Sequence, residues 1–130
     1  MTTRHVLTIL AVSDVARSAR FYADTFGWPR EVDLPVYVEL ALPGSLRLGL
    51  YARAGFAANT GEAPAQVPPG GIGPTELYLH TDDLEQACTR LREAGARELS
   101  GPAPRPWGDR AAYFSDPDGN VVVVATPDAR

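Results

Sequence analysis

Several features that mark large classes of function are absent from this sequence. All twelve basic residues are arginines, none is a lysine, and they are spread along a chain with sixteen acidic residues and a formal net charge of −4. This distribution contains no basic run that would neutralise nucleic-acid phosphates or attract the chain to an anionic membrane. The first apolar stretch stops at Ser13-Asp14, too short for a signal peptide or a membrane span. We therefore expect a cytoplasmic protein that binds neither nucleic acid nor membranes.

Cysteine is also scarce. The lone Cys88 excludes an internal disulfide bond, and its place in a helical pattern favours a small buried hydrophobic residue over a reactive thiol. The remaining composition is ordinary, because 45% of the 130 residues are hydrophobic and 22% are charged. This is enough for the core of one globular domain and too little for two independent ones. We expect a single domain over residues 1–130.

One pattern of residues occurs twice along the chain, and such a repeat determines the expected architecture. In its first copy, the apolar segment Val6–Val12 is followed by Ser13-Asp14, and Gly27 comes later. Between them, four residues recur at helical spacing: Val15, Ala19, Tyr22 and Phe26. Asp14 suits a helix start and Gly27 suits a helix end. The first copy therefore predicts a strand, a helix and a helix stop.

The second copy has the same order. The apolar segment Leu77–Leu79 precedes Thr81-Asp82, and the helical pattern that follows ends at Gly95. The residues on its apolar face are Leu84, Ala87, Cys88 and Leu91. Glu85 lies three residues after Asp82, so we expect a capping box there.

After each predicted helix the apolar period changes to two, which is typical of strands. In the first half, alternating residues flank the turn Pro43-Gly44; they are Val36, Val38, Leu40, Leu46, Leu48 and Leu50. In the second half, Ala112 and Phe114 precede the turn Asp116-Pro117-Asp118-Gly119-Asn120, and Val121–Val124 follows it. We expect an α+β fold of two βαβββ modules, at about residues 4–52 and 75–127.

The segment between the modules, residues 53–74, is rich in glycine and proline. This composition suits a linker rather than a strand or a helix. The linker is either a passive tether or a lid over a site. Phe56 lies in it, where no core requires an aromatic residue, so we expect this side chain to contact a ligand or a partner subunit.

The two modules and their motifs resemble a known superfamily. The segment from Val12 to Tyr22, with Gly27 after it, resembles the first strand and helix of the vicinal oxygen chelate superfamily, which includes glyoxalases, bleomycin-resistance proteins and extradiol dioxygenases. Trp107-Gly108 and the turn at Asp116–Asn120 resemble its final hairpin. The resemblance covers nearly the whole chain. It implies an incomplete barrel with the helices outside and a ligand cavity inside, and it implies a homodimer.

Enzymes of this superfamily usually hold one divalent metal ion with His and Glu side chains from the first and last strands of both modules. Counting from the helix starts and the hairpin turns locates the corresponding positions at Leu7, Gly49, Glu76 and Val123. A catalytic ion needs about three protein ligands, and only Glu76 offers one. The closest resemblance is therefore to the metal-free, bleomycin-resistance-like branch, and we expect no cofactor. A displaced metal site is the alternative; its candidate ligands are His5, Glu39, Glu76 and His80.

Strand alternation separates the residues that face the helices from those that face the predicted cavity. The leucines and valines of the hairpins face the helices, so their neighbours line the cavity, with Phe56 and Trp107 in loops beside it. A slip of one residue would invert any one of these sets. The predicted ligand-binding residues are Leu7, Ile9, Tyr37, Glu39, Arg47, Gly49, Tyr51, Phe56, Glu76, Tyr78, His80, Trp107 and Tyr113.

This set suits a bulky aromatic ligand. Tyrosines offer apolar area and stacking, Gly49 leaves room for a flat group near the backbone, and the charged side chains fix orientation. Glu76 is costly between apolar neighbours on a central strand unless it faces a cavity or pairs with Arg47 or Arg110. The tyrosines alternatively fill the barrel, and Trp107 alternatively anchors the core or a dimer.

The leading hypothesis is a metal-independent protein, not an enzyme, that sequesters an aromatic antibiotic or natural product and so confers resistance or self-resistance. The alternative is an enzyme of the same fold, a lyase, isomerase or dioxygenase, with a displaced metal or with Glu76 and His80 as acid and base. These two residues lie about 13 Å apart along one strand, too far to act on one atom. A regulatory or interaction module with a filled barrel is the third hypothesis.

Overall fold

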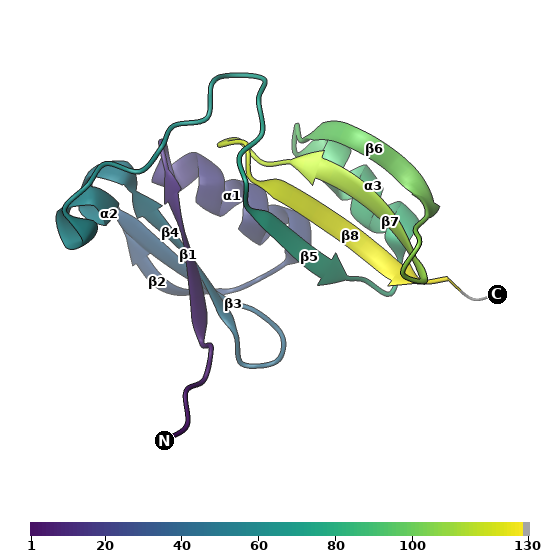
Figure 1. The fold of residues 1–130 in the computed structure, drawn as a ribbon, viewed down its shortest axis with the longest axis horizontal. Helices are drawn as coiled ribbons and strands as arrows, with labels where there is room; N and C mark the ends of the chain where they lie inside the picture. The colour runs from purple at the N-terminus through teal and green to yellow at the C-terminus, as the bar shows by residue number, and fades with distance from the viewer. Residues whose placement is uncertain (129–130) are drawn as a thin grey trace. The chain divides into compact units, whose positions relative to one another are not determined.

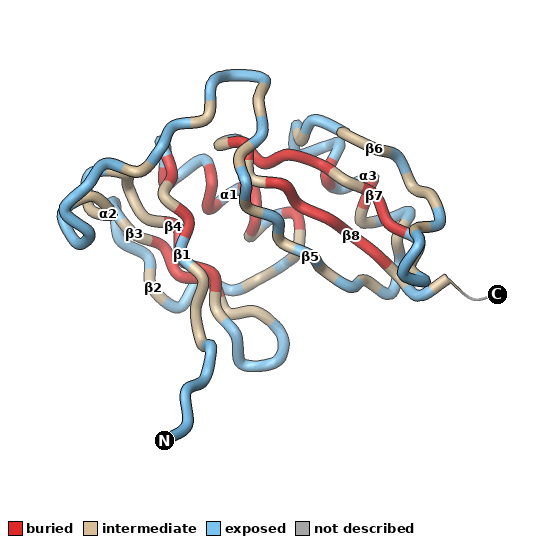
Figure 2. The backbone as a smooth tube through the Cα atoms, in the orientation of Figure 1, coloured by how far each residue is buried: buried red, intermediate tan, exposed pale blue. Residues whose placement is uncertain are grey.

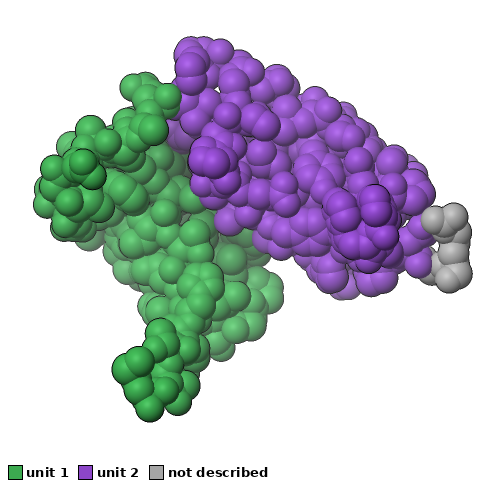
Figure 3. Space-filling model, viewed as in Figure 1, with its two compact units in different colours: residues 1–66 green, residues 67–130 purple. Residues whose placement is uncertain are grey.

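The computed structural model describes residues 1–128 and divides the chain into two compact units, residues 1–66 and the part from Val67 onward (Figure 3). The first unit contains β1 (Leu7–Val12), α1 (Val15–Phe26), β2 (Arg30–Leu34), β3 (Tyr37–Ala41), β4 (Arg47–Ala52) and α2 (Arg53–Thr60). The second contains β5 (Glu76–His80), α3 (Leu84–Glu93), β6 (Arg97–Pro104), β7 (Asp109–Ser115) and β8 (Val121–Pro127) (Figure 1). In the described part of the chain, no helix combines the length and apolar character needed to cross a membrane.

Each unit contains one four-stranded sheet, in the order β1-β4-β3-β2 or β5-β8-β7-β6. The outer strands β1 and β5 run parallel to their neighbours, and the other pairs are antiparallel. Neither sheet, as far as the chain is described, closes into a barrel. The predicted α+β class and both βαβββ modules are therefore confirmed.

Helices α1 and α3 pack against the two sheets and bury the predicted apolar faces. α1 packs on β3 and β4, and α3 packs on β6, β7 and β8. The buried backbone concentrates on the central strands (Figure 2). The core side chains of the first sheet are Leu10, Val12, Val38, Leu40, Leu48 and Leu50. Val36 and Leu46, which the alternation also assigned to the core, lie just outside the strands and are exposed.

Helix α1 begins and ends where its sequence predicts. The Asp14 side chain accepts a hydrogen bond from the backbone N–H of Arg17, which satisfies one of the unpaired donors of the first turn. Gly27 has φ 71° and its N–H donates to the carbonyl of Ala23. Both ends of this helix are therefore determined by local chemistry.

Helix α3 differs from the prediction by one residue at its start. The N-cap is Asp83 rather than the predicted Asp82, and the Asp83 side chain accepts from the backbone N–H of Gln86 at 3.0 Å. The predicted pairing of Asp82 with Glu85 is therefore wrong. Two adjacent aspartates fit the capping pattern equally well in sequence, and the hydrogen bond from Gln86 identifies Asp83 as the cap.

This difference gives a direct test. We expect Asp83→Ala to lower the free energy of unfolding by about 1 kcal/mol, because a helix N–H loses its acceptor. Asp82→Ala, its matched control, is expected to change it by less than about 0.5 kcal/mol. Urea unfolding of the two variants measures both values. A larger loss for Asp82→Ala would contradict the assignment of the cap.

The predicted linker contains a helix. Residues Arg53–Thr60 form α2, which packs against β1 and β4, so the expectation of an irregular segment over 53–74 is wrong in its first part. All four prolines of this segment lie after residue 60, and the average composition concealed a helix-compatible stretch before them. The Arg53 guanidinium also donates to the carbonyls of Pro64 and Ala65, which holds the chain where it leaves the helix.

Candidate functional site

The strand register brings the predicted ligand-binding residues of the first half onto one face of the first sheet. Gly49 pairs with Ile9 on one side and with Glu39 on the other, Tyr51 pairs with Tyr37, and Arg47 pairs with Leu7. No slip of one residue has occurred, so the predicted face is confirmed. We call this surface the first tyrosine face; it consists of Leu7, Ile9, Tyr37, Glu39, Arg47, Gly49 and Tyr51. Contact of these residues with a ligand stays a prediction.

A polar cluster lies at the centre of the first tyrosine face. The Tyr37 hydroxyl donates to Glu39 Oε1 at 2.6 Å, and Arg47 Nη1 donates to Glu39 Oε2 at 2.9 Å. Glu39 is only 7% exposed, and these two donors satisfy its two oxygens. Burial, followed by the hydrogen bond to Glu39, raises the pKa of Tyr37 well above its usual range, so its hydroxyl stays protonated. The cluster stabilises the buried carboxylate internally.

The space beside Gly49 is filled by the protein itself. A Cβ atom at Gly49 would lie 2.6 Å from Tyr37 Oη and 2.9 Å from Tyr37 Cε1, so the Tyr37 ring covers the backbone there. The Tyr51 ring packs edge-on against Tyr37, with the ring centroids 5.3 Å apart, and closely approaches Gly55 of α2. The expectation that Gly49 leaves room for a flat group of the ligand is therefore wrong.

Two further aspects of this region differ from the prediction. Phe56 lies on helix α2 and is half-buried, so it is not a loop residue. Strand β2 adds Val32 and Leu34 to the same face, because they pair with Glu39 and Tyr37. Their alternation in Val32-Asp33-Leu34 was a usable signal that the sequence reasoning missed.

The second sheet has a corresponding surface. Register places Tyr78 beside Val123, which pairs with Tyr113, while His80 pairs with Ala125 and Glu76 pairs with Val121. Adding Asp109 from the start of β7, we define the second tyrosine face as Glu76, Tyr78, His80, Asp109, Tyr113 and Val123. Val123 is 0% exposed within an apolar cluster. The other members of that cluster are Leu99, Ala111, Tyr113, Val121 and Ala125.

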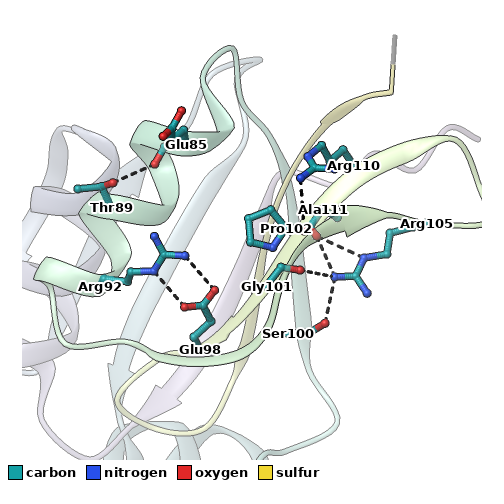
Figure 4. A network of polar contacts seen from close by, with 10 residues as sticks. All are labelled: Glu85, Thr89, Arg92, Glu98, Ser100, Gly101, Pro102, Arg105, Arg110 and Ala111. Atoms are coloured by element: carbon teal, nitrogen blue, oxygen red, sulfur yellow. Dashed lines mark hydrogen bonds and ion pairs between the residues drawn. The ribbon is translucent and has the colours of Figure 1, made fainter. Parts of the chain in front are cut away.

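Arg105 covers part of this face and holds strand β6. The register of β6 against β7 shifts twice, between Glu98 and Ala103, which interrupts the ladder. Figure 4 shows the Arg105 guanidinium directed at Ser100, Gly101 and Ala111, and its Nη2 donates to Ser100 Oγ at 3.0 Å and to the two carbonyls at 2.9 Å. Its Cζ also lies 4.8 Å from the centre of the Tyr113 ring, a cation–π distance. One ring face of Tyr113 is therefore occupied by an arginine.

A hydrogen-bonded cluster lies at the end of the second tyrosine face. Trp107 Nε1 donates to the Tyr78 hydroxyl at 2.8 Å, and that hydroxyl donates to Asp109 Oδ2 at 2.5 Å. His80 Nε2 lies 3.2 Å from the same carboxylate oxygen. We call these four residues the Trp107 cluster. Asp109 was missed by the sequence reasoning, although counting back in twos from Tyr113 places it on this face.

The charges of the Trp107 cluster follow from its contacts. The hydrogen bond from Tyr78, followed by that from His80, holds the pKa of Asp109 below its usual range despite partial desolvation. Desolvation and then the hydrogen bond to Asp109 raise the pKa of Tyr78. At neutral pH the cluster therefore contains an aspartate anion and a neutral tyrosine.

Glu76 does not need the explanation that its sequence context suggested. Its strand β5 is an outer strand of the sheet rather than a central one, and the side chain is exposed to solvent. Arg47 pairs with Glu39, and Arg110 donates to the carbonyl of Pro102 (Figure 4). Within the described part of the second unit, Glu76 therefore forms no ion pair with Arg110. Exposure to solvent removes the desolvation cost that a buried carboxylate would have.

The four positions that hold metal in related enzymes do not fit a metal ion here. Leu7, Gly49 and Val123 have no donor atom, Gly49 is covered by Tyr37, and Val123 is enclosed by apolar side chains. Over residues 1–128, no three His, Cys, Asp or Glu side chains converge in a way that would hold an ion. His5, a candidate for a displaced site, is exposed and hydrogen-bonds to Thr8 Oγ1 at 3.0 Å.

Comparisons with known proteins agree with this architecture. A family model described as "Glyoxalase/Bleomycin resistance protein/Dioxygenase superfamily" matches residues 3–124. The chain is 29% identical over 118 residues to the uncharacterized protein YraH of Bacillus subtilis (strain 168), covering 88% of this chain and 91% of that protein. It superposes on a glyoxalase-related enzyme from Fulvimarina pelagi with a TM-score of 0.84 at 23% identity, covering 96% of this chain and 88% of the other.

A lactoylglutathione lyase from Agrobacterium tumefaciens has the same fold, with a TM-score of 0.71 at 22% identity and coverage of 97% and 95%. At these identities the two structural matches show the fold alone. The chemistry of this chain has to be argued from its own residues.

Proposed function

Because the chain belongs to the glyoxalase/bleomycin resistance/dioxygenase superfamily, we propose that it is a metal-independent binding protein that sequesters an aromatic antibiotic or natural product. The observation that carries the proposal is the set of residues at the metal positions, where Leu7, Gly49 and Val123 offer no donor. One carboxylate, that of Glu76, is too few ligands for a divalent ion. Capture of the compound, rather than its conversion, then confers resistance or self-resistance.

The two tyrosine faces support the aromatic character of the ligand. They carry tyrosine rings and aliphatic side chains, and Ile9, Tyr78 and Trp107 are exposed. Apolar and aromatic area supplies most of the affinity in small-molecule sites, while a few polar groups set the orientation. Within this proposal the protein is a cytoplasmic homodimer, and light scattering of the purified protein tests the dimer.

A metal-free enzyme is the second candidate, and one observation favours it. The imidazole of His80 lies against the carboxylate of Asp109, an arrangement that supports a general base. Asp109 replaces Glu76 as the acidic partner of His80, because Glu76 lies at the opposite end of β5 from His80. Turnover of a bound compound, followed by mass spectrometry, would favour this second candidate over sequestration.

A thermal-shift screen against aromatic antibiotics tests the proposal. A bound compound at about 100 times its Kd adds about 2.7 kcal/mol of stability, which corresponds to a rise in Tm of roughly 10 °C. We expect at least one such compound, and the same rise after EDTA treatment. The proposal fails if no compound binds more tightly than about 1 mM in calorimetry. It also fails if binding requires a stoichiometric metal ion.

A further inference from the structure

The Trp107 cluster combines exposed aromatic rings with a constrained set of hydrogen bonds. Trp107 is 58% exposed, and the side chain of His80 is 61% exposed, whereas that of Asp109 is only 15% exposed. A large ring that is held in place by a hydrogen bond but left open to water is available for stacking. The hydrogen bond to Tyr78 already positions the Trp107 ring, so its exposed surface can contact a ligand.

Counting donors and acceptors shows what the cluster offers to a ligand. The single N–H of Trp107 is used on the Tyr78 hydroxyl, and the single O–H of Tyr78 is used on Asp109. The Asp109 carboxylate is ionised, so it only accepts, and the hydrogen between it and His80 must therefore sit on Nε2. In the neutral imidazole this leaves His80 Nδ1 as an acceptor.

With a neutral imidazole at His80, the atoms that remain without a partner in the described part of the cluster are all acceptors. They are His80 Nδ1, on an exposed side chain, and Asp109 Oδ1, on a mostly covered one. A ligand group that approaches His80 must bring a hydrogen to donate. The Tyr78 ring centre lies 6.0 Å from that of His80. A ligand that stacks its aromatic ring on Tyr78 therefore needs its hydrogen-bond donor on or next to that ring to reach His80.

We propose that the Trp107 cluster selects flat aromatic ligands that carry a hydrogen-bond donor, such as a phenolic hydroxyl, and rejects their O-methyl ethers. This step rests on the proposed binding function and names the ligand class. Methylation removes the donor, leaves His80 Nδ1 unpaired beneath the ligand and places a methyl group against it. The loss of one such hydrogen bond weakens binding by about tenfold to a hundredfold.

The test compares 2-naphthol with 2-methoxynaphthalene, which differ only in this methyl group, by NMR titration that follows the indole N–H of Trp107. Wild-type protein is expected to bind 2-naphthol at least about tenfold more tightly. His80→Ala is expected to bring the two affinities together by weakening 2-naphthol alone. His5→Ala, the matched control at the other histidine, is expected to keep the preference, because His5 is an exposed residue of the first unit that hydrogen-bonds to Thr8.

His80 is exposed on an outer strand, so His80→Ala is compatible with folding, and a thermal melt checks this. Asp109→Asn provides a second variant; it is expected to reduce the preference because the tautomer of His80 is no longer fixed. Equal affinities in wild type, or a preference that survives in His80→Ala, would overturn the inference. Neither result would contradict the proposed function if the antibiotic screen yields a ligand.

Failure of both naphthalenes to bind would likewise overturn the inference, and an empty screen as well would remove the proposed function. Trp107→Ala tests whether the Trp107 ring contacts the ligand or a partner subunit. We expect it to weaken 2-naphthol about tenfold without changing the molecular mass in light scattering. A change in mass with unchanged affinity would assign the ring to a subunit contact instead, and would overturn the inference.

Discussion

Asp116→Ala is expected to lower the free energy of unfolding by about 3–5 kcal/mol. The buried carboxylate organises the final hairpin turn, because Oδ1 accepts from the backbone N–H groups of Asp118 at 2.9 Å and Asn120 at 2.8 Å. Oδ2 accepts from Asn120 Nδ2 at 3.0 Å. Hydrogen bonds to a charged group contribute about 1.5–3 kcal/mol each, and their contributions overlap within one network. Urea unfolding followed by circular dichroism measures the change.

The control for this variant is Asn120→Ala. It removes only the side-chain donor to Oδ2 and leaves both backbone donors in place, so we expect a loss of about 1 kcal/mol. A small effect of Asp116→Ala, no larger than that of its control, would show that the turn forms without the carboxylate. In that case the turn motif would owe its shape to Pro117 and Gly119 instead.

Gly119→Ala is the second variant with a large expected effect, about 2–4 kcal/mol. Gly119 has φ 86°, a region that costs a residue with a side chain about 1–2 kcal/mol. A Cβ atom there would also lie 2.8 Å from Val67 Cγ1 and 3.0 Å from the carbonyl oxygen of Gly71. Because the backbone oxygen has little freedom to move, the contact adds to the conformational cost.

Gly95→Ala isolates the contact term. Gly95 has φ 84° but no atom within 4 Å of its hypothetical Cβ, so only the conformational cost of about 1–2 kcal/mol applies. Chemical unfolding of the two variants under the same conditions gives the difference. Equal losses would show that the segment around Val67 and Gly71 moves away from the turn without cost.

Asp116 and Gly119 both lie in the turn motif that carries much of the resemblance to the superfamily. The hydrogen bonds of Asp116 described above stay within the turn, and Gly119 closely approaches Val67 and Gly71. The motif thus predicted the fold correctly while carrying no information on the ligand. The proposed function rests instead on Leu7, Gly49 and Val123, which offer no donor atom to a metal ion.

Local signals predicted the fold well. Asp14 and Gly27 delimit α1 as expected, and the alternating leucines of β4 lie in the core. Two local signals failed. The adjacent Asp82 and Asp83 were indistinguishable as caps, and helix α2 was concealed by the glycines and prolines that follow it.

The candidate site was predicted less completely, and the reasons are physical. Alternation assigned Tyr37 and Gly49 to one face, but the packing of one against the other depends on pairing across strands. Glu76 was misjudged because its strand lies at the sheet edge. Alternation back from Tyr113 could have placed Asp109 on its face, but its hydrogen bonds join it to Tyr78 and His80, about thirty residues away along the chain.

The sequence by itself determined the two modules, the faces of their strands and the absence of donors at the metal positions, because periodicity, caps and residue type act locally. Tertiary structure alone decided which side chains meet: Arg47 with Glu39, Tyr37 with Gly49, and Tyr78 with Trp107 and Asp109. Strand order and register set those meetings, since they bring together residues that are far apart along the chain.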